Sequence, residues 1–150
     1  MPTVKIVKQI DASPEQVWDL ISDIRKGPEW VTVMKELIHT TDNPLTEGAV
    51  YRELSRVGPN EDETEWTVTT FDPPNIQVHQ SRESDMHIDL TMQVMPDGDG
   101  TRFLHQTEFT MMPSFRPLGW LLETLFVKRI MSRELRQTVE NLKRMCEGRP

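Results

Sequence analysis

Three side chains of this sequence could move protons or donate hydrogen bonds inside a site: Tyr51, Glu53 and His105. Histidine titrates near neutral pH, and burial can raise the pKa of a glutamate into the same range. With a tyrosine hydroxyl, such groups suit an aldol-type cyclisation or dehydration, which requires proton removal beside a carbonyl and stabilisation of an enolate. Structural interpretations are equally open: His105 as a core histidine bonded to a neighbour, and Glu53 at a strand end in solvent.

Other chemistries have less support in the sequence. It contains no closed set of metal ligands at suitable spacing, no Gly-rich phosphate loop and no nucleophile elbow. His79, His87 and Asp89 could approach one another on the outer side of a hairpin, but they do not complete such a set. The single cysteine, Cys146, falls on an apolar helical stripe, which favours a structural role over a nucleophilic one. We therefore expect neither a metal nor a cofactor.

Length and charge restrict the class of protein. The 150 residues fit one domain, residues 1–150, with a core of its own. A net charge of -7 disfavours nucleic-acid binding, because phosphates must be neutralised by Lys and Arg. One cysteine fits a reducing compartment, and no apolar run approaches the roughly 18 residues that span a bilayer. We expect a cytoplasmic protein without stable membrane insertion.

Strands dominate the first three quarters of the chain. Segment 3–10 alternates imperfectly between apolar and polar residues, and Ser13, Pro14 and Gln16 then give a helix start with a capping box. A Gly-Pro break follows, with one further short helical turn. Turn residues separate the later segments, and "PDGDG" is the strongest hairpin signal. Six strands are predicted, over residues 33–40, 49–57, 63–71, 76–81, 87–95 and 101–111.

A single long helix is predicted to close the chain. From Pro117 onward helix formers dominate, and apolar residues recur every three to four positions. The pattern predicts a helix of roughly 30 residues, about 45 Å long. Such a helix buries its stripe most readily across the apolar face of an antiparallel sheet, so the fold class is α+β.

Several stretches resemble a known superfamily. They are "ASPEQVWDLISD", "PEWV", "WTVTTFDPP", "GTRFLHQTEFT" and the closing "LKRMCE". They resemble the START/Bet v 1-like (SRPBCC) superfamily, and most of all its polyketide cyclase/dehydrase branch. The resemblance implies a helix-grip fold: a curved seven-stranded antiparallel sheet around a long C-terminal helix, with two short helices after the first strand. It also implies a cavity between sheet and helix that mostly binds apolar or amphipathic molecules.

The resemblance, with the alternation of side chains along strands, predicts which residues face that cavity. Segment 76–81 is expected to present Ile76, Val78 and Gln80 to it, leaving Gln77 and His79 on the wet face. A mostly apolar face with a few polar groups is typical of a small-molecule site. The predicted ligand-binding residues are Trp30, Tyr51, Trp66, Val68, Val78, Gln80, Leu90, Met92, Phe103, His105, Thr107, Leu121 and Leu125.

Two functions follow as hypotheses. The first is the binding, as a carrier or sensor, of a hydrophobic or amphipathic small molecule. The alternative is an enzyme of the polyketide cyclase/dehydratase type, with His105, Tyr51 and Glu53 as its catalytic candidates. The apolar start of the last helix adds a further expectation. Its residues surround much of the circumference, so some of them should line the pocket mouth or a homodimer contact rather than a membrane.

Overall fold

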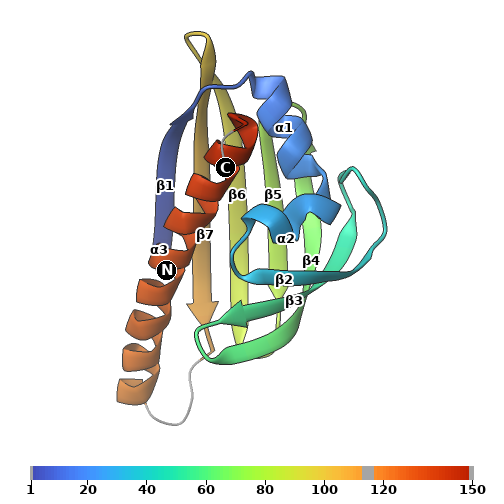
Figure 1. The fold of residues 1–150 in the computed structure, drawn as a ribbon. Helices are drawn as coiled ribbons and strands as arrows, with labels where there is room; N and C mark the ends of the chain where they lie inside the picture. Colours follow the sequence, from blue (N-terminus) through green and yellow to red (C-terminus); the bar gives the residue numbers. More distant parts are fainter. Residues whose placement is uncertain (1, 113–116, 149–150) are drawn as a thin grey trace.

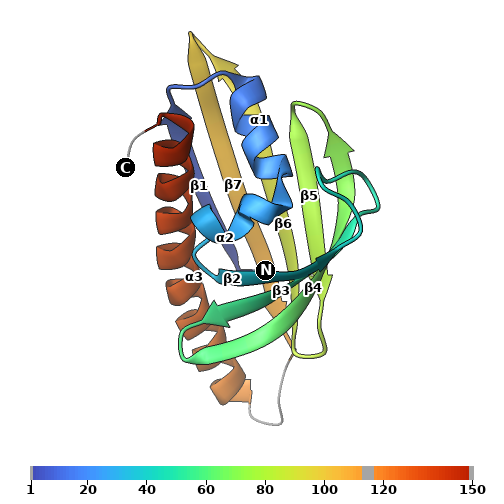
Figure 2. The same cartoon turned by 45° about the vertical axis from the view of Figure 1, so that its right-hand side comes forward.

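A computed structural model describes residues 2–112 and 117–148, with the side chains of residues 117 and 118 left out. Seven strands form one antiparallel sheet in the order β1-β7-β6-β5-β4-β3-β2. The helices lie across one face of it, called the inner face here; the opposite face is the outer face (Figures 1 and 2). The bounds are β1 Thr3–Ile10, α1 Pro14–Ser22, α2 Gly27–Trp30, β2 Met34–Thr40, β3 Val50–Val57, β4 Asn60–Asp72, β5 Ile76–Arg82, β6 Met86–Asp97, β7 Gly100–Met111 and α3 Pro117–Cys146.

This arrangement confirms the predicted fold. The capping box at the start of α1 is present: Ser13 Oγ accepts from the Gln16 amide at 3.2 Å, and Gln16 Oε1 accepts from the Ser13 amide at 2.9 Å. A short 3-10 turn, Ile24–Lys26, joins α1 to α2. On the inner face, α1 contacts β6 and β7, whereas α2 contacts β2 and α3 (Figures 1 and 2).

Two apolar clusters fill the space between helices and sheet. The first, under α1 and the end of α3, contains Trp18, Phe103 and Leu142. The second, toward β3 and β4, contains Trp66, Val68 and Phe109. Trp18 is buried against Phe71, with ring centroids 5.1 Å apart, so it lies in the core as its helical position suggests.

The predicted face of β5 is wrong. Gln77, His79 and Ser81 are buried on the inner face, whereas Val78 and Gln80 lie on the outer face. The cause is cross-strand pairing: His79 lies opposite the inward-facing Val68, and partners in a ladder share a face. The superfamily pattern and the alternation along the strand had predicted the opposite face.

A β-bulge in β4 maintains this arrangement. The pairing passes from Val68↔His79 to Thr70↔Val78, so one residue of β4 is skipped. Such a bulge reverses which side chains of the bulged strand point inward. Phe71 therefore faces inward opposite Gln77, and it packs against both apolar clusters.

Candidate functional site

A chain of hydrogen bonds crosses the inner face from β3 to α1. The Tyr51 hydroxyl lies 2.7 Å from Nδ1 of His79, and Nε2 of His79 lies 2.8 Å from Oε1 of Gln77. Nε2 of Gln77 donates to Oγ of Ser22 at 3.1 Å. All four residues are buried. The chain thus links the sheet interior to the last turn of α1.

The chain fixes the protonation of His79. An amide oxygen only accepts hydrogen bonds, so Nε2 of His79 is protonated and donates to Oε1 of Gln77. Nδ1 is then the acceptor, and Tyr51 donates to it. Burial lowers the pKa of His79 to about 4 and keeps the ring neutral at pH 7. Burial, and secondarily the carboxyl of Glu53, raises the pKa of Tyr51 well above its usual range, so the hydroxyl stays protonated.

Glu53 forms a second buried pair beside Tyr51. Its Oε1 accepts from the indole nitrogen of Trp66 at 2.8 Å, which partly satisfies the carboxyl. Burial raises the pKa of Glu53 to about 7, against the smaller opposing effect of that hydrogen bond. The carboxyl therefore exchanges its proton near neutral pH, which is the property of a general acid or base.

His105 has no such partner. Its Nδ1 is buried without a hydrogen bond. Its ring packs edge-on against that of Phe103, with the ring centroids 6.1 Å apart. Burial, with a smaller contribution from His79, lowers the pKa of His105 to about 3, so the ring is neutral. A buried polar atom without a partner costs free energy, on the order of 1–3 kcal/mol. A ligand that offers a partner to this ring would recover part of that cost.

An apolar strip separates His105 from His79. Leu90 of β6 pairs with His79 on one side and Thr107 on the other. The next inward residue, Met92, pairs with Gln77 and His105. Leu90 packs against both apolar clusters but is only partly buried. The centre of the inner face is thus an apolar surface with polar groups along both sides.

The structure separates the predicted site residues into two groups. Those that lie on the inner face or in the core beside it are Trp30, Tyr51, Glu53, Trp66, Val68, Leu90, Met92, Phe103, His105 and Thr107. Tyr51 and Glu53 are neighbours on β3, whereas His105 lies on β7 and shares no hydrogen bond with them. Their roles as ligand contacts or catalysts remain predictions.

Four predicted ligand contacts lie elsewhere. Val78 and Gln80 are on the outer face, for the pairing reason given above. Leu121 and Leu125 are 46% and 57% exposed, because Thr124 is the residue that this turn of α3 buries. The sheet ends near the first turns of α3, so the strands do not cover the side of the helix that carries these two leucines (Figure 1).

Sequence reasoning missed Ser22, Gln77, His79 and Ser81 as interior polar residues. One signal was present. In "IQVHQSR" polar residues recur at alternate positions, 77, 79 and 81, and the other face is itself half polar, since it carries Gln80 and Arg82. A strand that buries its polar side contradicts the usual pattern, and such contradictions mark functional or strained sites.

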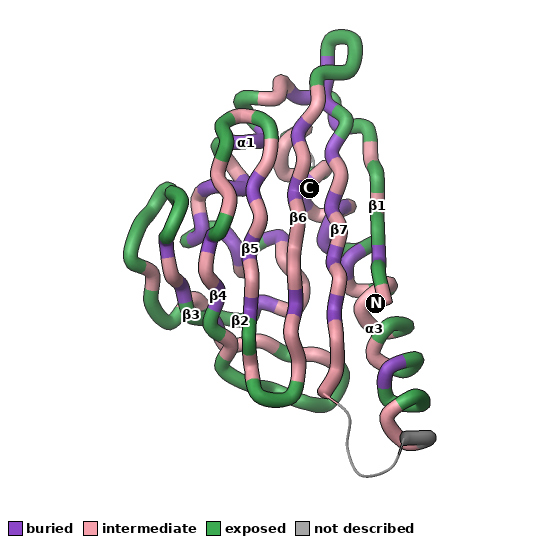
Figure 3. The backbone as a smooth tube through the Cα atoms, turned by 180° about the vertical axis from the view of Figure 1, so that it is seen from behind, coloured by how far each residue is buried: buried purple, intermediate pink, exposed green. Residues whose placement is uncertain are grey.

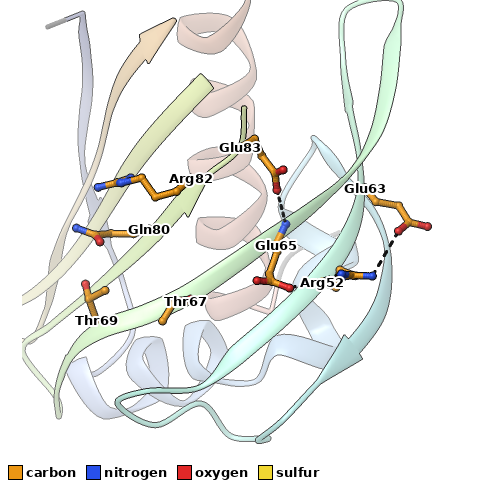
Figure 4. A pocket seen from close by; sticks show the side chains of 8 residues that line it. All are labelled: Arg52, Glu63, Glu65, Thr67, Thr69, Gln80, Arg82 and Glu83. Carbon is orange, nitrogen blue, oxygen red and sulfur yellow. Dashed lines mark hydrogen bonds and ion pairs between the residues drawn. The ribbon is translucent and has the colours of Figure 1, made fainter. Parts of the chain in front are cut away.

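A shallow depression lies on the outer face. It has a volume of about 550 Å³ and is lined by polar side chains of β3, β4 and β5 (Figure 4). Gln80, predicted as a ligand contact, lies here beside Arg82. The arginines are already paired: Arg82 with Asp89 at 2.6 Å, and Arg52 with Glu65 at 3.5 Å. The depression therefore offers no unpaired cation to a ligand.

The described part of the chain contains neither a cluster of metal ligands nor a membrane-spanning helix. No group of three His, Cys, Asp or Glu residues there could hold a metal ion, and His79 is bonded within the sheet interior. Burial raises the pKa of the Cys146 thiol to about 11, so it is not an activated nucleophile. Across residues 2–112 and 117–148, no helix is long and apolar enough to cross a membrane.

Comparison with known proteins gives consistent matches. Residues 1–147 match the family described as "Polyketide cyclase / dehydrase and lipid transport". Uncharacterized protein Rv1546 of Mycobacterium tuberculosis (strain H37Rv) is 24% identical over 120 residues, covering 79% of this chain and 84% of that protein. The structure of TTHA0849 from Thermus thermophilus aligns with a TM-score of 0.81 and 19% identity, covering 98% of both chains.

A named enzyme has the same fold. The Zhui aromatase/cyclase from Streptomyces sp. R1128 aligns with a TM-score of 0.81 and 12% identity, covering 97% of this chain and 93% of that chain. At these identities the two structural matches establish the shared fold alone.

Proposed function

Since this chain belongs to the polyketide cyclase / dehydrase and lipid transport family, we propose that it binds a neutral, largely apolar small molecule on the inner face of the sheet, around Leu90. The partial exposure of Leu90 carries the proposal. This side chain contacts both apolar clusters, yet neither cluster covers it completely. An apolar ligand would complete the burial there, at about 25 cal/mol per Å² of apolar surface.

The charge of the interior supports a neutral ligand. Among the buried polar side chains of the described residues there is no Lys or Arg, while Glu53 is acidic. An anion entering here would lose its hydration and find no cation in return. Neutral His105 can instead hydrogen-bond to a hydroxyl or carbonyl group. We therefore favour molecules such as alcohols, ketones and esters over free acids.

Two related fluorescent probes test this proposal. N-phenyl-1-naphthylamine is neutral, and 1-anilinonaphthalene-8-sulfonate is a similar molecule with a negative charge. We expect the neutral probe to bind with a micromolar Kd and a blue-shifted emission, and the sulfonate to bind at least about tenfold more weakly. Native mass spectrometry of gently purified protein should also reveal a neutral small molecule bound to the chain.

Two substitutions locate the probe. Leu90→Phe places a larger ring on the inner face and should weaken binding of the neutral probe by about tenfold or more. Val78→Phe makes a similar change on the outer face and should leave the affinity unchanged. Circular dichroism controls for folding. Equal effects of the two substitutions, or no binding of the neutral probe and no co-purified molecule, would refute the proposal.

An enzyme of the cyclase or dehydratase type is the second candidate. The observation that favours it is the pKa of about 7 at Glu53, beside the hydrogen-bonded pair of Tyr51 and His79. In an aldol-type cyclisation Glu53 would take the proton from the carbon beside a carbonyl. The Tyr51 hydroxyl, which has one proton to donate, would turn from Nδ1 of His79 to the enolate oxygen that forms.

Turnover of a poly-β-keto thioester tests this second candidate. Glu53→Gln and Tyr51→Phe should each reduce turnover by about a hundredfold or more, the usual contribution of acid–base catalysis. Affinity for the neutral probe should persist in both variants, since each keeps the volume of the side chain. Unchanged turnover in both variants would exclude these roles and leave the binding proposal intact.

A further inference from the structure

The first turns of α3 expose four large apolar side chains. Leu121, Leu122, Leu125 and Phe126 are between 46% and 61% exposed, and together they are called the apolar patch. The helix buries Thr124 in the same turns, so its apolar residues face outward and a smaller polar residue faces inward. In Figure 3 this part of α3 extends past the sheet and is largely exposed.

Basic side chains continue the same surface. Lys128, Arg129, Arg133 and Arg136, called the basic patch, are all exposed. At 100° per residue, the two patches share one arc of about 160° around the helix, apolar in the first turns and basic in the next. Between residues 121 and 136 that arc contains no acidic residue, because Glu123 and Glu134 both fall outside it. Glu140 lies in line with the arc one turn further along the helix, where it is paired with Lys8.

The arc contrasts with the remainder of the molecule. The chain as a whole carries a net charge of -7, so other surfaces are predominantly acidic. The β3–β4 turn approaches α3 at Ile130, on a side of the helix away from the arc. Near that turn, Glu61 is already paired with Arg56 at 2.7 Å. An anionic partner would therefore be attracted to α3 and repelled by most other surfaces.

We infer that the start of α3 is a docking surface for an anionic lipid membrane. The apolar patch would enter the boundary between headgroups and acyl chains, as amphipathic helices do, while the basic patch pairs with lipid phosphates. The interaction is peripheral and leaves the rest of the fold in water. It places α3 and the adjoining end of the inner face next to the bilayer.

A second copy of the chain fits this surface less well. A two-fold contact through the apolar patch with the helices parallel would bring the basic patches of both copies close together, and like charges placed together across an interface are costly. With the helices antiparallel, the basic patches would lie on opposite sides of the contact, and the arc between residues 121 and 136 offers them no acidic partner. An anionic membrane offers acyl chains to the apolar patch and phosphates to the basic patch.

Vesicle sedimentation of the full chain tests the inference. We expect binding to vesicles of phosphatidylcholine with phosphatidylglycerol, and much weaker binding to phosphatidylcholine alone. Raising the salt should weaken binding, because the Debye length falls from about 10 Å at 0.1 M to about 3 Å at 1 M. Equal binding to both kinds of vesicle at all salt concentrations would overturn the basic half of the inference.

Paired substitutions separate the two patches. Leu122→Ser with Phe126→Ser should weaken vesicle binding by about tenfold or more, through lost apolar burial. The control is Val7→Ser with Ile38→Ser, two other exposed apolar residues, at 47% and 43%. This control should bind vesicles like the parent chain.

A second pair tests the charge. Lys128→Gln with Arg129→Gln should weaken binding to anionic vesicles by about fivefold for each charge removed. Arg25→Gln with Lys26→Gln is the control, because both residues are exposed near α2, away from the patch. Binding that is lost equally in test and control variants would contradict the inference.

Sedimentation equilibrium distinguishes the competing occupant. A monomer that binds anionic vesicles supports the inference. A dimer that Leu122→Ser with Phe126→Ser dissociates, in a protein that does not bind vesicles, would overturn it. Binding of the neutral naphthylamine probe should persist in all these variants, so failure of membrane docking is separable from failure of the binding proposal.

Discussion

The Glu53 carboxyl lies where burial opposes its charge. Its pKa of about 7 compares with an ordinary value of 4.5, so between these pH values the folded chain holds a proton that the unfolded chain has released. Folding stability therefore falls as pH rises through this window. A difference of this size corresponds to about 3 kcal/mol at 1.36 kcal/mol per pH unit.

Glu53→Gln should remove this pH dependence. The amide keeps an acceptor for the Trp66 indole but cannot ionise, so the variant should gain stability relative to the parent chain as pH rises from about 5 to 8, by up to about 3 kcal/mol. Urea denaturation at both pH values measures the difference. Glu36→Gln, on an exposed stretch of β2, is the control and should show no such trend. Parallel pH dependence of the parent and Glu53→Gln would contradict a buried, raised-pKa carboxyl.

The two buried histidines act in the opposite direction. Their pKa values are lowered to about 4 for His79 and about 3 for His105, so they remain neutral in the folded chain while the unfolded chain takes up protons below about 6.5. The folding stability that comes from these two residues is lost as pH falls below about 6.5. Folding stability therefore falls at higher pH because of Glu53 and at lower pH because of the two histidines.

At the scale of elements, α1 depends on its first turn. Ser13 and Gln16 satisfy two backbone amides that the helix leaves free, and Pro14 fits the first helical position. The same helix supplies Ser22 to the hydrogen-bond chain and Trp18 to the core. Its start therefore influences both packing and the candidate site.

Ser13→Ala should weaken this start. Loss of a side-chain cap costs about 1 kcal/mol, which lowers the Tm by roughly 2–4 °C for a chain of this size. Differential scanning calorimetry measures the change. Ser84→Ala, in the exposed turn between β5 and β6, is the control and should leave the Tm unchanged. A Tm of Ser13→Ala equal to that of the control would show that the capping box does not stabilise the fold.

The strand β5 shows how an element can reverse its expected pattern. Ile76, Val78 and Gln80 were expected inside, from the superfamily pattern and the alternation along the strand. The structure instead buries Gln77, His79 and Ser81, and each of the first two has a hydrogen-bond partner. Their partners come from α1 and β3, which lie far away in the sequence. The burial of Gln77 and His79 is therefore tolerated because tertiary contacts satisfy them, whereas Oγ of Ser81 is buried without a partner.

At the scale of the whole molecule, α3 has two different environments. Its C-terminal half is covered by α1, α2 and β1, where Val139 and Leu142 are fully buried. Its first turns extend past the strands and keep their apolar patch exposed (Figures 1 and 3). The helix thus anchors the core at one end and presents an amphipathic surface at the other.

Local patterns in the sequence determined much of this protein. The capping box, the turn residues between strands and the periodicity of the last helix each depend on near neighbours, so the elements could be predicted from them. The helix-grip fold was implied by the resemblance of several stretches to the START/Bet v 1-like superfamily. The superfamily pattern and the regular alternation within β3 and β7 also placed Tyr51, Glu53 and His105 on the inner face. The alternative of a solvent position for Glu53 is excluded only by its burial in the structure.

Only the tertiary structure decided how these elements meet. The bulge in β4 and its pairing with β5 placed His79 inside, and the length of α3 beyond the sheet left Leu121 and Leu125 exposed. The pKa values of Glu53 and His79 likewise follow from burial by distant segments. Register and burial arise from contacts between residues that are remote in the sequence. The alternation within one strand shows that it has two faces, but it does not determine which of them turns inward.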